Sequence, residues 1–186
     1  MDEAKLRALR EKYVDAKGSD GITGKFKDVA DALFSGDNNR TKPYAGISSF
    51  LDLPIHENAE GLDIALVGVP MDLGVTNRPG ARFGPRAMRE IERIGPYNHV
   101  QELAPHTMCK AADIGDVPFR SRYSLEDSFE DIAAYYKEIV ATGARVLSIG
   151  GDHSITWPIL QAVAEKQPVA LVHIDAHCDT SSEFED

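Results

Sequence analysis

The sequence predicts an α/β fold with a mainly parallel sheet covered by helices on both faces. Short apolar runs rich in β-branched residues recur along the chain, and segments with helical periodicity separate them. Two of these runs are apolar almost throughout, which is typical of strands buried on both faces. Strands that alternate with helices form right-handed βαβ units, and the strands of such units are parallel.

The predicted strands and the first helix follow in order from residue 63. The apolar runs that indicate strands are residues 63–69, 110–114 (the weakest), 145–149 and 169–174. Residues 84–94 (GPRAMREIERI) are predicted to form a helix, because Pro85 is favoured in a first helical turn.

Two further helices are predicted between the later strands. Ser124 is expected to begin the first of them, since Asp127 completes the start signal and Gly143 lies just past the end. The second follows the strand at 145–149, with Ser154 or Thr156 as its cap. Residues 1–42 hold two short helix patterns and too little apolar surface for a core, so they are predicted to be an N-terminal extension. Residues 43–186 are assigned to one α/β domain.

Composition and charge exclude several classes of protein. The net charge of −10 argues against nucleic acid and anionic membranes as partners, because both need clustered cations. We find no apolar run of membrane-spanning length, and the acidic start is not typical of a signal peptide. Two cysteines are too few for a disulfide framework, so a cytoplasmic location is expected.

Chemically reactive side chains follow the last two predicted strands. Asp175, His177 and Asp179 follow the fourth strand at two-residue spacing, and His153 lies in the sequence GGDHS after the third. Ligands bind outside the carboxyl ends of strands in open α/β sheets, so these side chains meet if the two strands are neighbours. A carboxylate at the end of so apolar a strand also needs a counter-charge. The pattern predicts a metal site formed by these four residues.

The two-residue spacing constrains that site further. In a fully extended chain Asp175 and Asp179 would lie roughly 13 Å apart, too far for one ion. The chain must therefore curl after Asp175, or the residues must serve more than one ion, with Asp175 as a natural shared ligand. Mixed carboxylate and imidazole ligands suit Mn²⁺, although ligand type does not separate Mn²⁺ from Ni²⁺. Two close ions can share a water and make hydroxide available near neutral pH.

Other polar residues near the strand ends receive different interpretations. His173 lies inside the apolar run and is interpreted as a core or supporting histidine rather than a ligand. The glycines before His153 are expected to permit the tight turn that aims it inward. Asn77, Arg78 and Arg82 lie in a loop after the first strand, where a structural role is at least as well supported as substrate contact.

The combination of motifs resembles the ureohydrolase family, which comprises arginases, agmatinases, guanidinobutyrases and guanidino-acid hydrolases. GGDHS at 150–154 and DAHCDT at 175–180 carry the resemblance, together with PYAGISSF, ADIGDV and GVPMDLGVTNRPGARFGPRAMREIE. The similarity runs from about residue 43 to residue 180. PYAGISSF and GVTNRPGARFGP are more similar to the agmatinase and guanidino-acid branch than to arginases.

The resemblance implies a three-layer α/β/α arginase-like fold with two Mn²⁺ ions per active site. In that family a metal-bridging hydroxide attacks the guanidinium carbon and releases urea and an amine. By position, His153 and Asp179 complete one metal's shell, His177 binds the other, and Asp175 bridges. Asp152 takes no ligand role and is interpreted as a loop or supporting residue. The resemblance implies a homotrimer or homohexamer, in which residues 1–42 would serve as an arm on a neighbour.

The resemblance also implies that residues 43–186 are the N-terminal part of one domain, incomplete at the C-terminus, since family members run to about 300 residues. The family's proton-shuttling histidine, remaining aspartate ligands and substrate-binding acids lie beyond Asp186. No catalytic residue other than the metal ligands is therefore assigned, and the 186-residue chain by itself is expected to be inactive. The substrate stays open between agmatine, guanidino acids and guanidine itself.

Three other interpretations compete with a guanidino hydrolase. A non-catalytic fragment or assembly subunit of the same fold would explain the missing half of the metal shell, and urea release would exclude it. A nucleotide-binding domain would use LSIGGDHS to hold phosphate at a helix N-terminus, but this sequence matches neither common phosphate-binding motif. A deacetylase on the same sheet architecture fits the paired GGDHS and DAHCDT motifs poorly.

Overall fold

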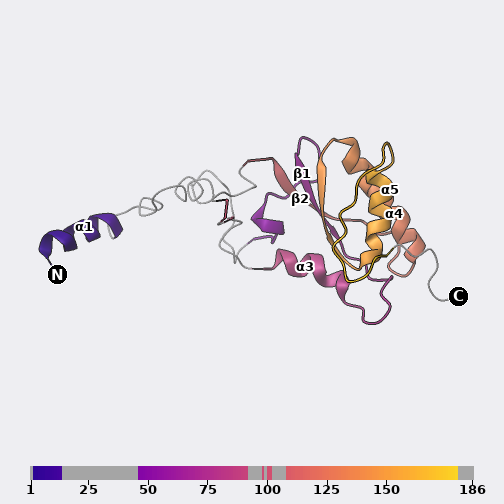
Figure 1. Cartoon of the computed structure of the whole chain (residues 1–186), viewed down its shortest axis with the longest axis horizontal. Helices are drawn as coiled ribbons and strands as arrows, with labels where there is room; N and C mark the ends of the chain where they lie inside the picture. The colour runs from indigo at the N-terminus through magenta and orange to yellow at the C-terminus, as the bar shows by residue number, and fades with distance from the viewer. Residues whose placement is uncertain (1, 14–45, 92–97, 99, 102–107, 180–186) are drawn as a thin grey trace.

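The computed structural model describes residues 2–13, 46–91, 98, 100–101 and 108–179 of the chain (Figure 1). The strands are β1 (Ile64–Val69), β2 (Ala111–Asp116) and β3 (Arg145–Gly150). The α-helices are α1 (Glu3–Tyr13), α3 (Gly84–Arg89), α4 (Leu125–Ala141) and α5 (Thr156–Val163). Short 3₁₀ turns are η2 (Phe50–Asp52), η3 (Ala81–Phe83) and η5 (His153–Ile155).

The three strands form one parallel sheet in the order β2-β1-β3. β1 pairs with β3 in unbroken register, from Ile64 opposite Arg145 to Val69 opposite Gly150. The β1–β2 ladder shifts register after Leu66. Because all strands are parallel, their carboxyl ends share one edge of the sheet, as the sequence predicts.

Two cores on opposite faces of the sheet give the three layers. Ala65, Val67 and Val69 of β1 pack in the larger core, which α4 and α5 cover. Leu66 faces the other way and packs with Phe50 and Leu53, on the side of η2 and α3. This alternation along β1 follows from the two-residue period of a strand. The predicted α/β fold with both faces covered is confirmed.

Helix α4 begins as the sequence predicts. The hydroxyl of Ser124 accepts a hydrogen bond from the backbone N–H of Asp127 (3.1 Å), and Gly143 beyond the helix has a φ of +85°. The predicted cap of α5 is wrong. The turn η5 runs directly into α5, so the first unpaired N–H groups belong to η5, and Asp152 caps them by accepting from Ser154 N (2.9 Å).

Two predicted elements differ in extent at the ends of the described segments. Helix α3 ends at Arg89, before the predicted end at residue 94, and residues 92–97 lie outside the described part. Pro85 occupies the first turn of α3, as predicted. Of the predicted extension 1–42, the structure describes α1, whose side chains at residues 2–8 are exposed apart from a half-buried Leu6.

The predicted strand at 169–174 is wrong in this structure. These residues have no regular secondary structure, and their apolar side chains are exposed, with Val172 at 86% and Ile174 at 94%. A buried parallel strand needs helices on both faces, and within the described residues no element covers this segment. The apolar pattern therefore finds no burial here.

One buried ion-pair network, which the sequence did not reveal, joins three separate motifs. Arg89 of α3 donates to both carboxylate oxygens of Asp113 (2.7 and 2.9 Å) and to Asp116 (2.7 Å). Its guanidinium also lies over the ring of Phe50, 3.9 Å from the centroid. Asp113 in turn accepts from the backbone N–H of Phe50 (3.0 Å). Phe50, Arg89 and Asp113, one residue from each of the motifs PYAGISSF, GPRAMRE and ADIGDV, are thus held together on one face of the sheet.

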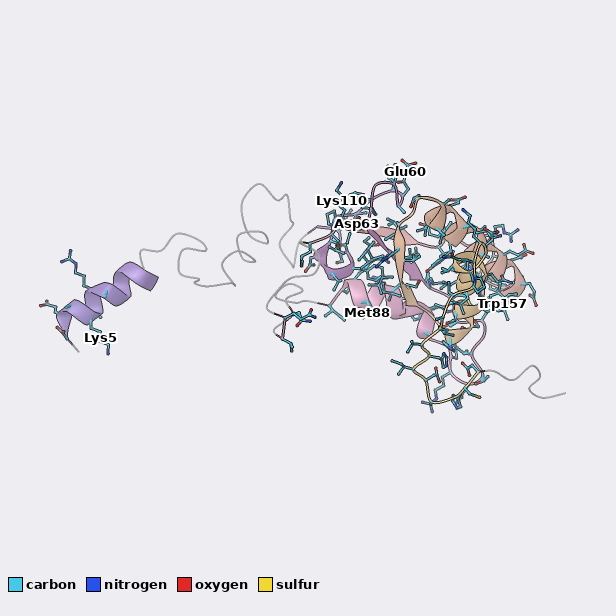
Figure 2. The ribbon with its side chains drawn as sticks, turned by 45° about the horizontal axis from the view of Figure 1, so that its top comes forward. Lys5, Glu60, Asp63, Met88, Lys110 and Trp157 are labelled. Atoms are coloured by element: carbon cyan, nitrogen blue, oxygen red, sulfur yellow. The ribbon has the colours of Figure 1, made fainter. Side chains whose placement is uncertain are left out.

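A side-chain hydrogen bond joins the amino ends of two strands, at the edge of the sheet opposite to the carboxyl ends. At the amino ends of β1 and β2, the backbone N–H of Lys110 donates to Asp63 (2.8 Å; Figure 2).

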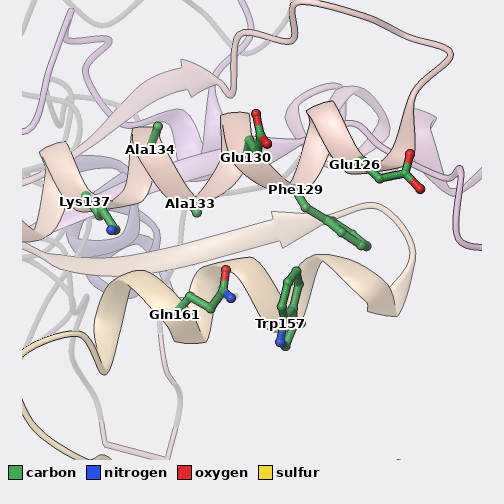
Figure 3. A pocket seen from close by; sticks show the side chains of 8 residues that line it. All are labelled: Glu126, Phe129, Glu130, Ala133, Ala134, Lys137, Trp157 and Gln161. Atoms are coloured by element: carbon green, nitrogen blue, oxygen red, sulfur yellow. The ribbon is translucent and has the colours of Figure 1, made fainter. Parts of the chain in front are cut away.

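The rings of Phe129 and Trp157 meet edge to face, with centroids 5.4 Å apart, and line a groove of about 460 Å³ between α4 and α5 (Figure 3). Among the described helices, none has the length and hydropathy needed to cross a bilayer.

Candidate metal centre

The turn after β3 sets the position of His153. Gly151 has a φ of +66°, a left-handed conformation that favours glycine. A Cβ on Gly151 would lie 2.4 Å from the carbonyl oxygen of Val69 and 2.6 Å from that of Met71. The chain can therefore make this turn against the end of β1 only without a side chain, as the sequence predicts.

The segment after residue 174 curls, which is one of the two alternatives that the spacing of its carboxylates left open. The carboxylate of Asp175 accepts a hydrogen bond from the backbone N–H of His177 (3.0 Å), which closes a tight turn. Asp179 has a φ of +48°, so the chain also bends there. These two bends bring the carboxylate of Asp179 back toward that of Asp175.

Four side chains converge at the carboxyl edge of β3. His153, His173, Asp175 and Asp179 each offer one ligand atom, and these atoms all lie within 4.8 Å of one another. Nε2 of His153 is 3.0 Å from Asp179 and 4.0 Å from Asp175, and Nε2 of His173 is 3.9 Å from Asp179. Ligand atoms about 2.2 Å from one ion lie at most about 4.4 Å apart, so the group is close to the size that one divalent ion needs.

The structure thus brings together three of the four predicted ligands and leaves His177 at the margin. The His177 side chain is 83% exposed, and its Nδ1 lies 3.6 Å from Oδ1 of Asp175. His153 faces Oδ2, the other oxygen of the same carboxylate. Asp175 therefore lies between two imidazoles, one facing each of its oxygens.

His173 is the member of the group that sequence reasoning did not select as a ligand. Its ring lies beside that of His153, with centroids 5.2 Å apart. A signal was present in the sequence, because His173 shares the two-residue alternation with Asp175. The surrounding apolar run argued for the core, but that run is exposed.

Asp175 is held in the charged form that a metal ligand requires. Its hydrogen bond from the His177 N–H is the main reason that the pKa of this carboxyl lies below its usual range. Desolvation opposes this effect in part, and the nearby imidazoles of His153 and His173 lower the pKa by smaller amounts. Two carboxylates and two imidazoles form a donor set that suits an ion of intermediate hardness such as Mn²⁺.

The loop after β1 is held by a buried carboxylate. Asp72 accepts from the side chain of Arg82 (2.6 Å) and from the backbone N–H of Gly80 (2.6 Å), and the bond to Arg82 is the main reason that the pKa of Asp72 is lowered. Arg82 therefore has the structural role that the sequence allowed. Asn77 and Arg78, between these anchors, are exposed.

The groove between α4 and α5 is not part of this centre. None of the four converging residues lines it, and its walls come from the two helices. The converging group, at the sheet edge predicted for ligands, is therefore the candidate functional site.

Comparison with curated proteins finds guanidino-compound hydrolases. The mitochondrial agmatinase of Gallus gallus is 54% identical over 138 residues, which are 73% of this chain and 40% of that protein. The mitochondrial guanidino acid hydrolase of Homo sapiens is 49% identical over 138 residues, 73% of this chain and 39% of that protein. The chain thus spans about two fifths of the length of these relatives.

Solved structures with the same fold include an amidino hydrolase and a manganese enzyme. Proclavaminate amidino hydrolase from Streptomyces clavuligerus superposes with a TM-score of 0.71 at 34% identity, over 78% of this chain and 48% of that chain. Trypanosoma cruzi formiminoglutamase with Mn²⁺ gives 0.51 at 27% identity, over 63% of this chain and 40% of that one. The Arginase family model matches residues 62–186, and the resemblance seen in the motifs is confirmed. The chain belongs to the arginase family.

Proposed function

We propose that the complete protein hydrolyses a guanidino compound, either agmatine or a guanidino acid, to urea and an amine. The observation that carries this proposal is the convergence of His153, Asp175 and Asp179 at the carboxyl edge of β3. The relatives named agmatinase and guanidino acid hydrolase support the substrate class. Guanidine itself is a third candidate substrate.

The cofactor of this proposal is a pair of divalent ions, with Mn²⁺ preferred and Ni²⁺ as the alternative. His153 and Asp179 would hold one ion, His177 the other, and Asp175 would bridge. The position of Asp175 supports bridging, because Oδ2 faces His153 and Oδ1 faces His177. The formiminoglutamase solved with Mn²⁺ supports the choice of metal.

Each group of the chain has a defined task in this proposal. Bound divalent ions supply Lewis acidity, which lowers the pKa of water and provides a nucleophile near neutral pH. Asp175 stays ionised because the His177 N–H stabilises its charge, so it offers an oxygen to either side. The ligand side chains are 28–83% exposed, so a substrate reaches them from solvent at the edge of the sheet.

Urea release from the metal-loaded protein tests the proposal. Agmatine, 4-guanidinobutyrate, 3-guanidinopropionate and guanidine would each be assayed with Mn²⁺ and after treatment with EDTA. Asp175→Asn should lower activity about 100-fold or more and remove both ions, since one bridging ligand serves both positions. His177→Asn should affect one ion and be less severe.

Glu60→Gln is the matched control, because Glu60 is an exposed carboxylate near the amino ends of β1 and β2 (Figure 2). Its activity and metal content should stay at the original level. Retention of both ions in Asp175→Asn would contradict the bridging role. Absence of urea from every substrate, in a complete protein that holds its metal, would favour the non-catalytic assembly subunit.

Assembly and location belong to the same proposal. A homotrimer or homohexamer with a small guanidino substrate is expected, without a nucleic acid or membrane partner. The cytoplasm was predicted from the sequence, whereas the relatives in Gallus gallus and Homo sapiens are named mitochondrial, which makes the mitochondrion a second candidate. Light scattering on the complete protein and imaging of a tagged copy would decide the two questions.

A further inference from the structure

Asp152, the residue before His153, joins two loops that meet at the carboxyl edge of the sheet. Its Oδ2 accepts from the backbone N–H of Gly74 (2.8 Å), in the loop after β1. Its Oδ1 accepts from the backbone N–H (2.9 Å) and the hydroxyl (2.5 Å) of Ser154, in the turn after β3. Its own backbone N–H donates to the carbonyl of Met71 (2.9 Å). Both carboxylate oxygens are therefore engaged by the two loops.

The space between these loops leaves little freedom for other arrangements. A Cβ on Gly74 would lie 2.5 Å from the hydroxyl oxygen of Ser154, so the loop after β1 lies directly against the turn. Gly151, the residue before Asp152, lies similarly close to the end of β1. Asp152 thus supplies the polar contacts of a junction that is already sterically tight.

His153 depends on this junction for its position. It is the first residue of η5, and Asp152 is the residue that caps η5. The His153 side chain is half exposed, so few packing contacts hold it. Nδ1 of its ring lies 3.3 Å from the hydroxyl oxygen of Thr156, which leaves Nε2 to face Asp175 and Asp179.

We propose that Asp152 is a positioning residue of the candidate metal centre, which fixes His153 by bridging the loop after β1 to the turn after β3. The proposal rests on the proposed function, because His153 acts there as a ligand. Loss of the bridge leaves the N–H groups of Gly74 and Ser154 without their acceptor and lets η5 move. Residues that orient a metal ligand in this way change metal affinity by about 10- to 100-fold when they are replaced.

The test uses the complete protein, with Mn²⁺ as the probe, and three variants. Asp152→Ala removes the bridge and the cap. Asp152→Ser keeps an N-cap oxygen for η5 but has no second oxygen for Gly74. Asp131→Ala is the matched control, because Asp131 of α4 also joins a loop to a helix, by accepting from the backbone N–H of Arg120 (2.8 Å), which precedes the helix.

Asp152→Ala and Asp152→Ser should each bind Mn²⁺ about 10-fold more weakly or worse, whereas Asp131→Ala should lower the melting temperature and leave Mn²⁺ affinity unchanged. An unchanged Mn²⁺ affinity in Asp152→Ala would overturn the proposal. An unchanged Mn²⁺ affinity in Asp152→Ser would show that the contact between Asp152 and Gly74 is not needed. An equal loss of Mn²⁺ affinity in Asp131→Ala would show that lower stability alone weakens metal binding, and would overturn the positioning role of Asp152.

A metal-free measurement keeps this inference separate from the proposed function. The ring ¹⁵N signals of His153, assigned by their absence in His153→Asn, should shift in Asp152→Ala and stay unchanged in Asp131→Ala. Unchanged ring signals in Asp152→Ala would overturn the positioning role even without metal. Failure of the unmodified complete protein to bind Mn²⁺ would instead contradict the proposed function, and the ring signals would still decide the role of Asp152.

Discussion

Strand β1 and the segment 169–174 have similar sequences, but only β1 forms a buried strand. Both are six-residue runs of Ile, Leu, Val and Ala with one exception each, Gly68 in β1 and His173 in the segment. β1 lies between two strands and two cores, and its residues Ala65–Val69 are buried, whereas Val172 and Ile174 are almost fully exposed. An apolar run therefore marks a segment that can form a buried strand. Whether the segment is buried depends on the helices and strands that pack against it.

The same comparison shows that the residues after an apolar segment can meet even where that segment does not form a strand. Asp175 and Asp179 meet His153 although the segment before them is not a strand. The turn at Asp175 depends on a local hydrogen bond from His177, and the turn at Gly151 depends on local backbone conformation. Local interactions of this kind form without the burial that a strand needs.

The largest expected effect concerns the ion pairs that hold α3 to the sheet. Arg89→Ala should lower the free energy of unfolding by about 3–5 kcal/mol, because it leaves Asp113 buried without its counter-charge. Arg86→Ala, which removes an exposed pair with Glu90 on the same helix, should cost about 0.5 kcal/mol or less. Urea denaturation of the three proteins measures both, and equal losses would show that burial does not distinguish these pairs.

The second prediction compares β1 and the segment 169–174 directly. Leu66→Ala should cost about 2–5 kcal/mol, because Leu66 is 2% exposed and its loss opens a cavity. Val172→Ala should change the free energy of unfolding by about 0.5 kcal/mol or less. A loss above about 2 kcal/mol for Val172→Ala would mean that this segment is buried as a strand in solution.

The third prediction concerns pH and the core under α4. Burial raises the pKa of Tyr136 to about 12, from 10.0, although its hydroxyl donates to Ser148 (2.7 Å). The unfolded chain then loses the phenol proton first, so the free energy of unfolding should fall by up to about 2–3 kcal/mol as pH rises from 10 to 12. Denaturation at several pH values in this range measures the change. The free energy of unfolding should fall less steeply with pH in Tyr136→Phe than in Tyr123→Phe, because the Tyr123 ring is exposed.

The smallest expected effect on stability is that of the N-terminal extension. Deletion of residues 1–40 should change the free energy of unfolding of the sheet by about 0.5 kcal/mol or less, because the described side chains of α1 are largely exposed. If this extension is an arm on a neighbouring copy, deletion should lower the oligomer mass of the complete protein. Light scattering with metal analysis distinguishes the cases, and an unchanged oligomer would rule the arm out.

The elements that were predicted correctly are those with local signals. Ser124 and Asp127 are three residues apart and cap α4 through a single hydrogen bond. The apolar runs that became β1 and β3 and the glycine turn before His153 also depend on residues close in sequence. Family membership followed from short motifs, each of which is continuous in the chain.

The sequence by itself determined the α/β class, the three strands β1, β2 and β3 of the central sheet and the start of α4. It also predicted His153, Asp175, His177 and Asp179 as metal ligands, which stays a prediction. Tertiary structure decided which side chains meet: it places His173, which was not predicted as a ligand, inside the group and His177 at its margin. It also decided that Arg89 pairs with Asp113 and that Asp152 bridges to Gly74, contacts between residues 24 and 78 positions apart. The physical reason is that hydrogen bonds between near neighbours depend on local conformation, whereas burial and long-range pairing depend on how separate segments pack together.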